Sequence, residues 1–297
     1  MAWVWLTCAK MGRAKMDLFR YDEVPSDWRR CLYITGGYRR NLSQSACIKS
    51  LFVFSNESVN IWSHLVSFLF FFGVLLWVNF ITIPNASLES SLIDHAVITF
   101  FLLCIEFCLF ASTGYHLFKC SSDPSVSIIW YRLDIIGIAI AVCGCYIPGL
   151  YYGFYCNMVW RRVYVGAVLL VVLFCFLAQF RTQASLHHNC QLVFMYSLAA
   201  AFGFIPFVHW ILISSSEIIS FFAPKVIVFY AVALLGVSFY VSRTPEKLWP
   251  GKFNFIGASH QVWHVLIAVS FIWWYYSCIS IYRYRASIPC SQTELPP

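Results

Sequence analysis

Three histidines are the residues of this sequence best suited to bind a metal ion. His260 and His264 are four residues apart, so on a helix their imidazoles share one face and can hold one ion. Three neutral imidazoles, with a fourth position left for water, are a common donor set of catalytic zinc sites. The sequence therefore predicts a zinc site, provided that the fold brings the distant His116 to the other two histidines.

Two further polar residues could complete a hydrolytic site. Ser112 precedes His116 by four residues and therefore lies on the same helix face. Asp134 lies in an apolar stretch, and we expect its carboxylate to orient a water rather than to bind the metal directly. Zinc makes water a nucleophile near neutral pH. We therefore assign Asp134 as the candidate catalytic base and Ser112 as its candidate polar support.

A second polar cluster contains Glu57, Asn60 and His64, whose spacing forms one stripe along a helix. The stripe is either a hydrogen-bonded network that supports the metal ligands or part of a proton path, and we favour the network. The alternative to a metal site is that the three histidines of the first set are core residues bonded to serines and carbonyls. Their position in the fold decides between these interpretations.

The composition predicts that lipid surrounds most of this chain. Of the 297 residues, 60% are hydrophobic and 11% are charged, whereas soluble domains carry about 25% charged residues. Seven apolar runs are long enough to cross a bilayer, which takes about 17–25 residues. The predicted fold is therefore an all-α integral membrane protein with seven transmembrane helices. The runs are Val59–Ile83, His95–Phe118, Val126–Pro148, Val163–Phe180, Gln191–Ser214, Phe222–Val241 and Ser259–Tyr282.

The distribution of lysine and arginine predicts the orientation. With the N-terminus in the cytoplasm, fifteen basic residues lie inside and five outside, as the positive-inside rule requires. The C-terminus is then lumenal or extracellular. This topology places His116, Asp134 and His260 at the same cytoplasmic depth. Ionisable residues within spans are expensive and commonly functional, so their convergence favours the metal site over three separate core histidines.

We divide the chain into three parts. Residues 1–58 form a basic cytosolic leader, residues 59–282 a zinc-binding membrane domain, and residues 283–297 a lumenal tail. The net charge of +7 comes mostly from the cytosolic face, which suits anionic lipids or acidic partners. It does not indicate nucleic-acid binding.

The ordered motifs resemble the progestin and adipoQ receptor family, which includes adiponectin receptors and haemolysin-III-like proteins. The resemblance rests on Glu57/Asn60/His64, Ser112/His116, Asp134 and the His260/His264 pair, spread over roughly residues 33–285. It implies seven spans with the N-terminus inside and three histidine ligands to zinc.

Longer strings, such as Gly257–His264, are similar to one branch of this family. That resemblance implies a Golgi membrane protein that tethers Raf kinase, or another cytosolic signalling protein, and restrains mitogen-activated kinase signalling. Three functions stay open: a scaffold, which we rank first; a hormone or lipid receptor, with the plasma membrane as the alternative location; and a ceramidase-like, zinc-dependent lipid amidase.

Three smaller predictions concern single residues. Cys156 and Cys290 both fall on the oxidising side and are a candidate disulfide. Asn85 begins a glycosylation motif on the lumenal side. Glu106 lies in the middle of the second span, where we expect a neutral carboxyl that is hydrogen-bonded to a neighbouring helix.

Overall fold

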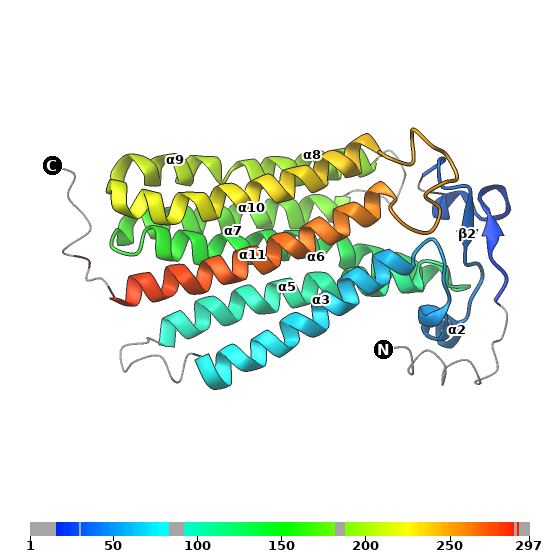
Figure 1. The fold of residues 1–297 in the computed structure, drawn as a ribbon, viewed down its shortest axis with the longest axis horizontal. Coiled ribbons are helices and arrows are strands. Elements are labelled where there is room, and N and C mark those ends of the chain that lie inside the picture. The colour runs from blue at the N-terminus through cyan, green and yellow to red at the C-terminus, as the bar shows by residue number, and fades with distance from the viewer. Residues whose placement is uncertain (1–15, 30, 83–91, 182–187, 288–289, 291–297) are drawn as a thin grey trace.

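A bundle of long helices dominates the computed structural model, which describes residues 16–29, 31–82, 92–181, 188–287 and 290 (Figure 1). Seven of its helices are long and apolar enough to span a membrane, which confirms the predicted all-α, seven-span fold. The direction of the chain across the membrane stays a prediction. The seven spans are α3 (Ser58–Trp77), extended by the π-helical turn η5 (Val78–Thr82), α5 (Leu92–Phe118), α6 (Pro124–Gly153), α7 (Met158–Arg181), the pair α8 (His188–Ala201) and α9 (Phe204–Ile213), which together form the fifth span, α10 (Ser216–Ser242) and α11 (Ser259–Ser287).

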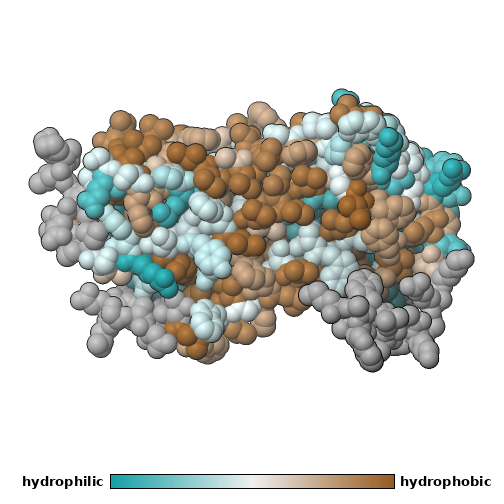
Figure 2. Space-filling model, viewed as in Figure 1, coloured by the Kyte–Doolittle hydropathy of each residue, from teal (hydrophilic) through white to brown (hydrophobic). Residues whose placement is uncertain are grey.

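The outer surface carries the pattern expected of a protein in lipid. Figure 2 shows a hydrophobic zone across the middle of the bundle, with hydrophilic residues gathered towards its two ends. Large apolar side chains such as Leu170 and Phe174 of α7 are two-thirds exposed. Inside the bundle, α5 packs between α3 and α6, and α11 packs against α10, α3 and α6. The most buried helices, α5 and α11, are therefore those that carry the three histidines.

Several helices extend past their predicted bounds. Helix α6 continues beyond Pro148 to Gly153, α10 begins six residues earlier than predicted, and α11 passes Tyr282 and ends at Ser287. A proline removes only one intrahelical hydrogen bond, and in a membrane neighbouring helices compensate for it. The hydroxyl of Ser215 caps α10 by accepting a hydrogen bond from the Ile218 amide, 3.5 Å away.

The fifth span is broken in the middle into α8 and α9. At the break the Gly203 amide donates to Ala200 O, so Ala199 O loses its usual partner four residues on. The hydroxyl of Tyr146 on α6 donates to both alanine carbonyls, at 2.8 and 2.9 Å, and Tyr230 on α10 donates to Ala200 O at 3.3 Å. Two neighbouring helices therefore satisfy the carbonyls that the break releases.

The described part of the leader, residues 16–29 and 31–58, is folded and covers one end of the bundle, which we call the histidine end (Figure 1). Strands β1 (Phe19–Arg20) and β2 (Gly36–Tyr38) pair antiparallel, and the short helices η2 (Tyr21–Glu23), η3 (Ser26–Trp28), α2 (Gln44–Lys49) and η4 (Ser50–Phe52) surround them. The leader also binds the α10–α11 loop: Gly251 N donates to Tyr33 O at 3.0 Å, and Thr35 N donates to Asn254 Oδ1 at 2.8 Å. This small sheet was not predicted.

The opposite end of the bundle, the disulfide end, is closed covalently. Cys156 follows α6 and forms a disulfide with Cys290, and their Cα atoms are 5.3 Å apart. Arg285 of α11 is buried there and donates to the carbonyls of Tyr152 and Gly153, at 2.9 and 3.2 Å. The candidate disulfide is therefore present in the structure. The glycosylation motif at Asn85 lies outside the described residues.

Candidate metal centre

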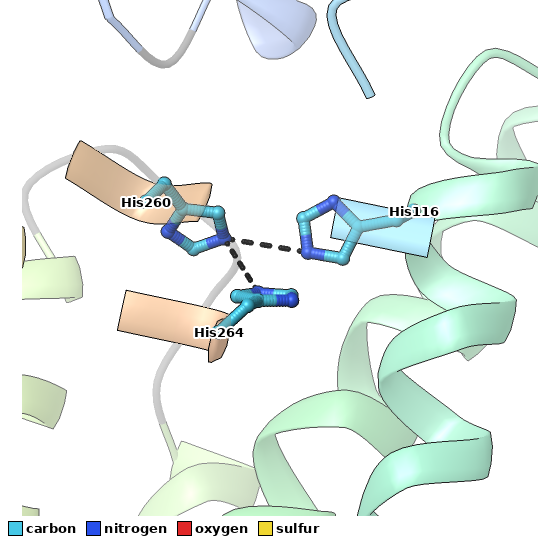
Figure 3. A group of neighbouring side chains, drawn as sticks. All are labelled: His116, His260 and His264. Atoms are coloured by element: carbon cyan, nitrogen blue, oxygen red, sulfur yellow. Dashed lines mark hydrogen bonds between the residues drawn. The ribbon is translucent and has the colours of Figure 1, made fainter. Parts of the chain in front are cut away.

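Three helix ends bring the histidines together at the histidine end of the bundle. His116 lies in the last turn of α5, and His260 and His264 lie in the first two turns of α11. Nε2 of His260 is 3.3 Å from Nε2 of His116 and 3.2 Å from Nε2 of His264 (Figure 3). The three candidate ligand atoms all lie within 4.8 Å of one another. Residues 144 positions apart in the sequence therefore share one site, as the topology predicted.

The spacing of these nitrogen atoms fits a tetrahedral zinc site. Zinc binds imidazole nitrogen at about 2.0–2.1 Å, so two ligands at a tetrahedral angle lie about 3.3–3.4 Å apart. The two distances from His260 to the other histidines match this value. The donor set therefore fits a metal ion, and a zinc ion there would supply Lewis acidity that polarises a carbonyl and acidifies water.

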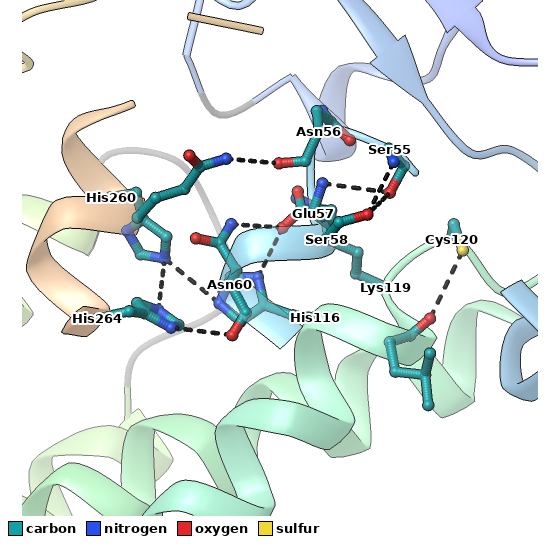
Figure 4. A network of polar contacts seen from close by, with 12 residues as sticks. Ser55, Asn56, Glu57, Ser58, Asn60, His116, Lys119, Cys120, His260 and His264 are labelled. Atoms are coloured by element: carbon teal, nitrogen blue, oxygen red, sulfur yellow. Dashed lines mark hydrogen bonds and ion pairs between the residues drawn. The ribbon is translucent and has the colours of Figure 1, made fainter. Parts of the chain in front are cut away.

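The second polar cluster supports this site. Nδ1 of His116 is 2.7 Å from a carboxylate oxygen of Glu57, and Asn60 Nδ2 donates to the same oxygen at 2.8 Å (Figure 4). Because a carboxylate accepts the Nδ1 proton, Nε2 of His116 keeps a free lone pair for a metal. The predicted network between Glu57 and the ligands is therefore present.

The Glu57 carboxyl is buried beside two basic partners. Burial raises its pKa, but the ammonium of Lys119, which forms a close ion pair with it, and the bond with His116 hold the pKa well below its usual range. Glu57 is therefore ionised at neutral pH and accepts a hydrogen bond from His116 Nδ1. Lys119 cancels the charge that the buried carboxylate would otherwise leave uncompensated.

His264 and His64 are held differently. Nδ1 of His264 is 3.3 Å from the carbonyl oxygen of Asn60, which orients its Nε2 towards the other two ligands. The ring of His64 stacks on that of His264, with centroids 3.9 Å apart and an interplanar angle of 17°. Neither ring nitrogen of His64 has a hydrogen-bond partner among the described residues. His64 thus belongs to the site by stacking, and not to the hydrogen-bonded network.

Two supporting residues were missed by the sequence analysis, which counted them only as positive charges. One is Lys119; the other is Arg39, which is 3% exposed. The guanidinium of Arg39 donates to the carbonyl of His116 at 2.7 Å, and so caps the helix turn that carries the first ligand. The position of Lys119, three residues after His116, was the only sequence signal available for either of them.

A long cavity opens on the histidines. Its volume is about 350 Å³, within the range of small-molecule sites. Ser112, Asp134 and His264 line one end, and Trp210 and Ile281 line the other. Ring and aliphatic side chains from α6, α8, α9, α10 and α11 form most of the wall between them. The arrangement is a mainly apolar channel with histidines, a carboxyl and a hydroxyl at one end.

The cavity is about twice as long as one acyl chain of a bilayer. His260 and Ile281 both line it, and at about 1.5 Å per residue they lie about 32 Å apart along α11. The hydrocarbon core of a bilayer, which two opposed acyl chains fill, is about 30 Å thick. A single long acyl chain therefore fits lengthwise. Ser112 and Asp134 line the same cavity as two of the histidines, and their catalytic roles stay predictions.

Glu106 differs from its prediction. It is buried in α5, but neither carboxyl oxygen has a hydrogen-bond partner among the described residues, so the predicted bond to a neighbouring helix is wrong. The position of Glu106 in the middle of a span predicted that it would be buried. The sequence did not predict which side chains of the neighbouring helix would face it. Glu106 does not line the cavity that opens on the histidines.

Similarity to known proteins covers the whole site. The chain matches the family described as "Haemolysin-III related" over residues 52–275, which include all three histidines, Glu57, Ser112 and Asp134. It is 40% identical over 277 residues to "Progestin and adipoQ receptor family member 3" of Mus musculus, covering 92% of this chain and 88% of the relative. The Homo sapiens protein of that name gives the same values. "ADIPOR-like receptor IZH2" of Saccharomyces cerevisiae is 32% identical over 272 residues, 88% of this chain and 83% of the relative.

Proposed function

Because the chain belongs to the haemolysin-III-related, or progestin and adipoQ receptor, family of membrane proteins, we propose that its buried histidines hold zinc for the hydrolysis of a long-chain lipid amide of the ceramide class. The observation that carries the proposal is the cavity, because a zinc ion that only linked helices would not need an apolar channel leading to it. This ranks a lipid amidase above the scaffold that the sequence alone favoured.

The proposed roles follow from positions at the wall of the cavity, except that of His116, which lies behind the wall beside His260. His116, His260 and His264 hold the metal, and the apolar wall holds the acyl chain and excludes water from it. The Asp134 carboxylate takes a proton from the attacking water and passes it to the nitrogen of the leaving amine. The amide carbonyl carbon gains the water oxygen and loses that nitrogen, giving a fatty acid and an amine. Ser112 donates a hydrogen bond to the reacting carbonyl group.

The experiment compares lipid turnover and metal content in the same preparations of the purified chain in lipid nanodiscs. We expect wild type to release fatty acid from ceramide and to contain zinc. Asp134→Asn is expected to keep zinc and to lower turnover by about 10²–10⁴-fold, the usual contribution of a general base. His209→Ala, at the disulfide end, is the control and keeps both properties.

Two other outcomes would change the assignment. Ceramide that binds without being hydrolysed would favour the receptor, since the same cavity would then serve as a ligand site. Turnover that survives Asp134→Asn would remove that residue from the mechanism.

The second candidate function is a scaffold that tethers Raf kinase, or another cytosolic signalling protein, at the Golgi membrane. It is favoured by the 40% identity to family member 3 over 92% of this chain. The folded leader and the α10–α11 loop offer a continuous surface for such a partner at the predicted cytoplasmic end.

The scaffold is tested with the full chain in cells. We expect the tagged chain to lie in the Golgi rather than the plasma membrane and to co-precipitate Raf kinase. Lys247→Glu with Lys252→Glu, on exposed positions of the α10–α11 loop, is expected to reduce that capture. A chain that captures no Raf kinase at any level of expression would exclude this function.

A further inference from the structure

Two thiols meet at the histidine end, outside the metal-ligand set. Cys47 lies in α2 of the leader, and Cys120 lies two residues beyond the end of α5. Their sulfur atoms are 3.9 Å apart, and the residues are 0% and 3% exposed. The pair joins segments 73 residues apart in the sequence, and one thiol donates its proton towards the other sulfur. A modest approach of the two sulfur atoms would bring them to disulfide bonding distance, about 2.05 Å.

The surroundings of Cys120 favour its thiolate. The hydrogen bond with Cys47 lowers the pKa of Cys120, burial raises it, the positive charges of Arg39 and Lys119 lower it, and the negative charge of Glu57 raises it, which together bring it to about 7. The pKa of Cys47 is instead raised, first by the same hydrogen bond and then by burial. Cys120 is therefore the thiol that reacts first with an oxidant, and Cys47 is the thiol that then forms the disulfide with it.

A small cavity reaches Cys120 but not Cys47. Its volume is about 10 Å³, and its wall includes Arg39, Glu57, Lys119 and Cys120. A cavity of about 10–15 Å³ holds one water molecule, so hydrogen peroxide, which is one oxygen atom larger, reaches the sulfur when the wall widens by that amount. Bulky oxidants such as glutathione disulfide do not fit there.

We propose that Cys47 and Cys120 form a peroxide-oxidised dithiol, a modification site separate from the metal centre. The Cys120 thiolate attacks one oxygen of hydrogen peroxide, the O–O bond breaks, and hydroxide leaves, giving a sulfenic acid. The Cys47 sulfur then attacks the Cys120 sulfur, the S–O bond breaks, and the released hydroxide takes the Cys47 proton as water. In total, two thiols and one hydrogen peroxide give one disulfide and two waters.

The disulfide would fasten the leader to the end of α5. The two segments already touch, since Leu42 N donates to Cys120 O at 3.0 Å and Ser122 N donates to Leu42 O at 2.8 Å. A chain of hydrogen bonds connects Cys47 to the metal-binding His116. Ser50 Oγ donates to Cys47 O at 2.6 Å, and the Arg39 guanidinium donates to both Ser50 Oγ and His116 O. Closing the bond therefore fixes the cap that covers the histidines.

The test titrates the purified full chain with hydrogen peroxide and maps its thiols by peptide mass spectrometry without reduction. We expect a Cys47–Cys120 crosslink, lighter by about 2 Da than the two free peptides together, which dithiothreitol reverses. Limited trypsin digestion of the leader should slow at least several-fold in the oxidised form. Cys47→Ala should leave a sulfenic acid on Cys120 that dimedone traps once the peroxide is removed and the chain is unfolded, and Cys120→Ala should leave neither product.

Two controls separate this pair from other thiols. Cys31→Ser removes another partly buried thiol of the leader and should not change the crosslink. The Cys156–Cys290 bond should stay intact throughout. The proposal is overturned if peroxide leaves Cys47 and Cys120 free to alkylation at doses that oxidise Cys31, or if Cys120 pairs with Cys31 instead.

Discussion

The two ends of the bundle use the same device for different purposes. At the histidine end, Arg39 donates to the carbonyls of His116 and Leu117 at the C-terminus of α5. At the disulfide end, Arg285 donates to the carbonyls of Tyr152 and Gly153 at the C-terminus of α6. Both are buried arginines that satisfy helix carbonyls and complement a helix dipole.

What differs is what the capped turn carries. The last turn of α5 carries a metal-binding histidine, whose ring is held in turn by Glu57. The last turn of α6 carries no such ligand and is secured by the Cys156–Cys290 disulfide in the loop that follows. One end is thus held by exchangeable polar contacts around a site for an ion, and the other by a covalent bond. Changes at the two ends should therefore have separable effects.

The largest expected effect is loss of metal from the histidine end. His260→Ala and His264→Ala each leave two of the three imidazoles, so we expect the zinc content of the purified chain to fall from about one per chain to near zero. Elemental analysis of the detergent-purified protein measures it. His209→Ala is the matched control, because this histidine bonds Tyr164 at the disulfide end, 2.8 Å away. Unchanged zinc in both site variants would refute the ligand assignment.

Opening the disulfide is expected to weaken the other end without emptying the site. Cys156→Ser with Cys290→Ser removes a link across 134 residues, and we expect the free energy of unfolding to fall by about 2–5 kcal/mol. Thermal unfolding in nanodiscs measures the change, with Cys31→Ser as the single-thiol control. Zinc content below the unfolding temperature should match wild type. A parallel loss of zinc would show that the two ends are coupled.

Removing the charge of Glu57 should weaken the metal site without abolishing it. Glu57→Gln keeps the size of the side chain but no longer accepts the His116 proton as a carboxylate, so zinc affinity should fall by about 10–100-fold. Competition with a zinc chelator gives the ratio. Glu217→Gln, in the exposed first turn of α10, should give the wild-type value. Equal affinities for both variants would mean that Glu57 only stabilises the fold.

The smallest effect concerns the far end of the cavity. A Cβ added at Gly153 would lie 3.8 Å from the Trp210 ring, so Gly153→Ala can be accommodated and narrows the channel there. We expect binding of the longest acyl chains to weaken by less than about tenfold, which corresponds to the lost burial of one or two methylene groups. Shorter chains should bind as before. Native mass spectrometry with a series of chain lengths measures this. Gly166→Ala in α7, where nothing lies within 4 Å of the added Cβ, is the control.

The sequence predicted the parts of the fold that depend on local chemistry. Hydropathy located the seven spans, and the charge distribution suggested that His116 and His260 share one depth, where the structure places them together. Helix ends were less predictable. Pro148 was predicted to end its helix, but α6 continues past it to Gly153. The helices packed around the proline, and not the sequence next to it, decide whether the helix breaks.

The missed parts of the site depend on contacts across the bundle. Arg39 and Lys119 look like ordinary positive charges near a membrane, and only the folded leader shows that both are buried against the end of α5. The cavity was not predicted either, because its wall consists of apolar residues like those of any tightly packed span. Volume left unfilled between helices leaves no pattern in a hydropathy profile.

The broken fifth span has a consequence for biosynthesis. Its two halves leave carbonyls of Ala199 and Ala200 that cannot be left unsatisfied in lipid. Tyr146, on α6, enters the membrane before this span does, whereas Tyr230, on α10, follows it. During synthesis, Tyr146 is therefore already in the membrane when the fifth span enters it, and Tyr230 arrives afterwards. Its stable insertion should depend on the order in which the ribosome delivers its neighbours.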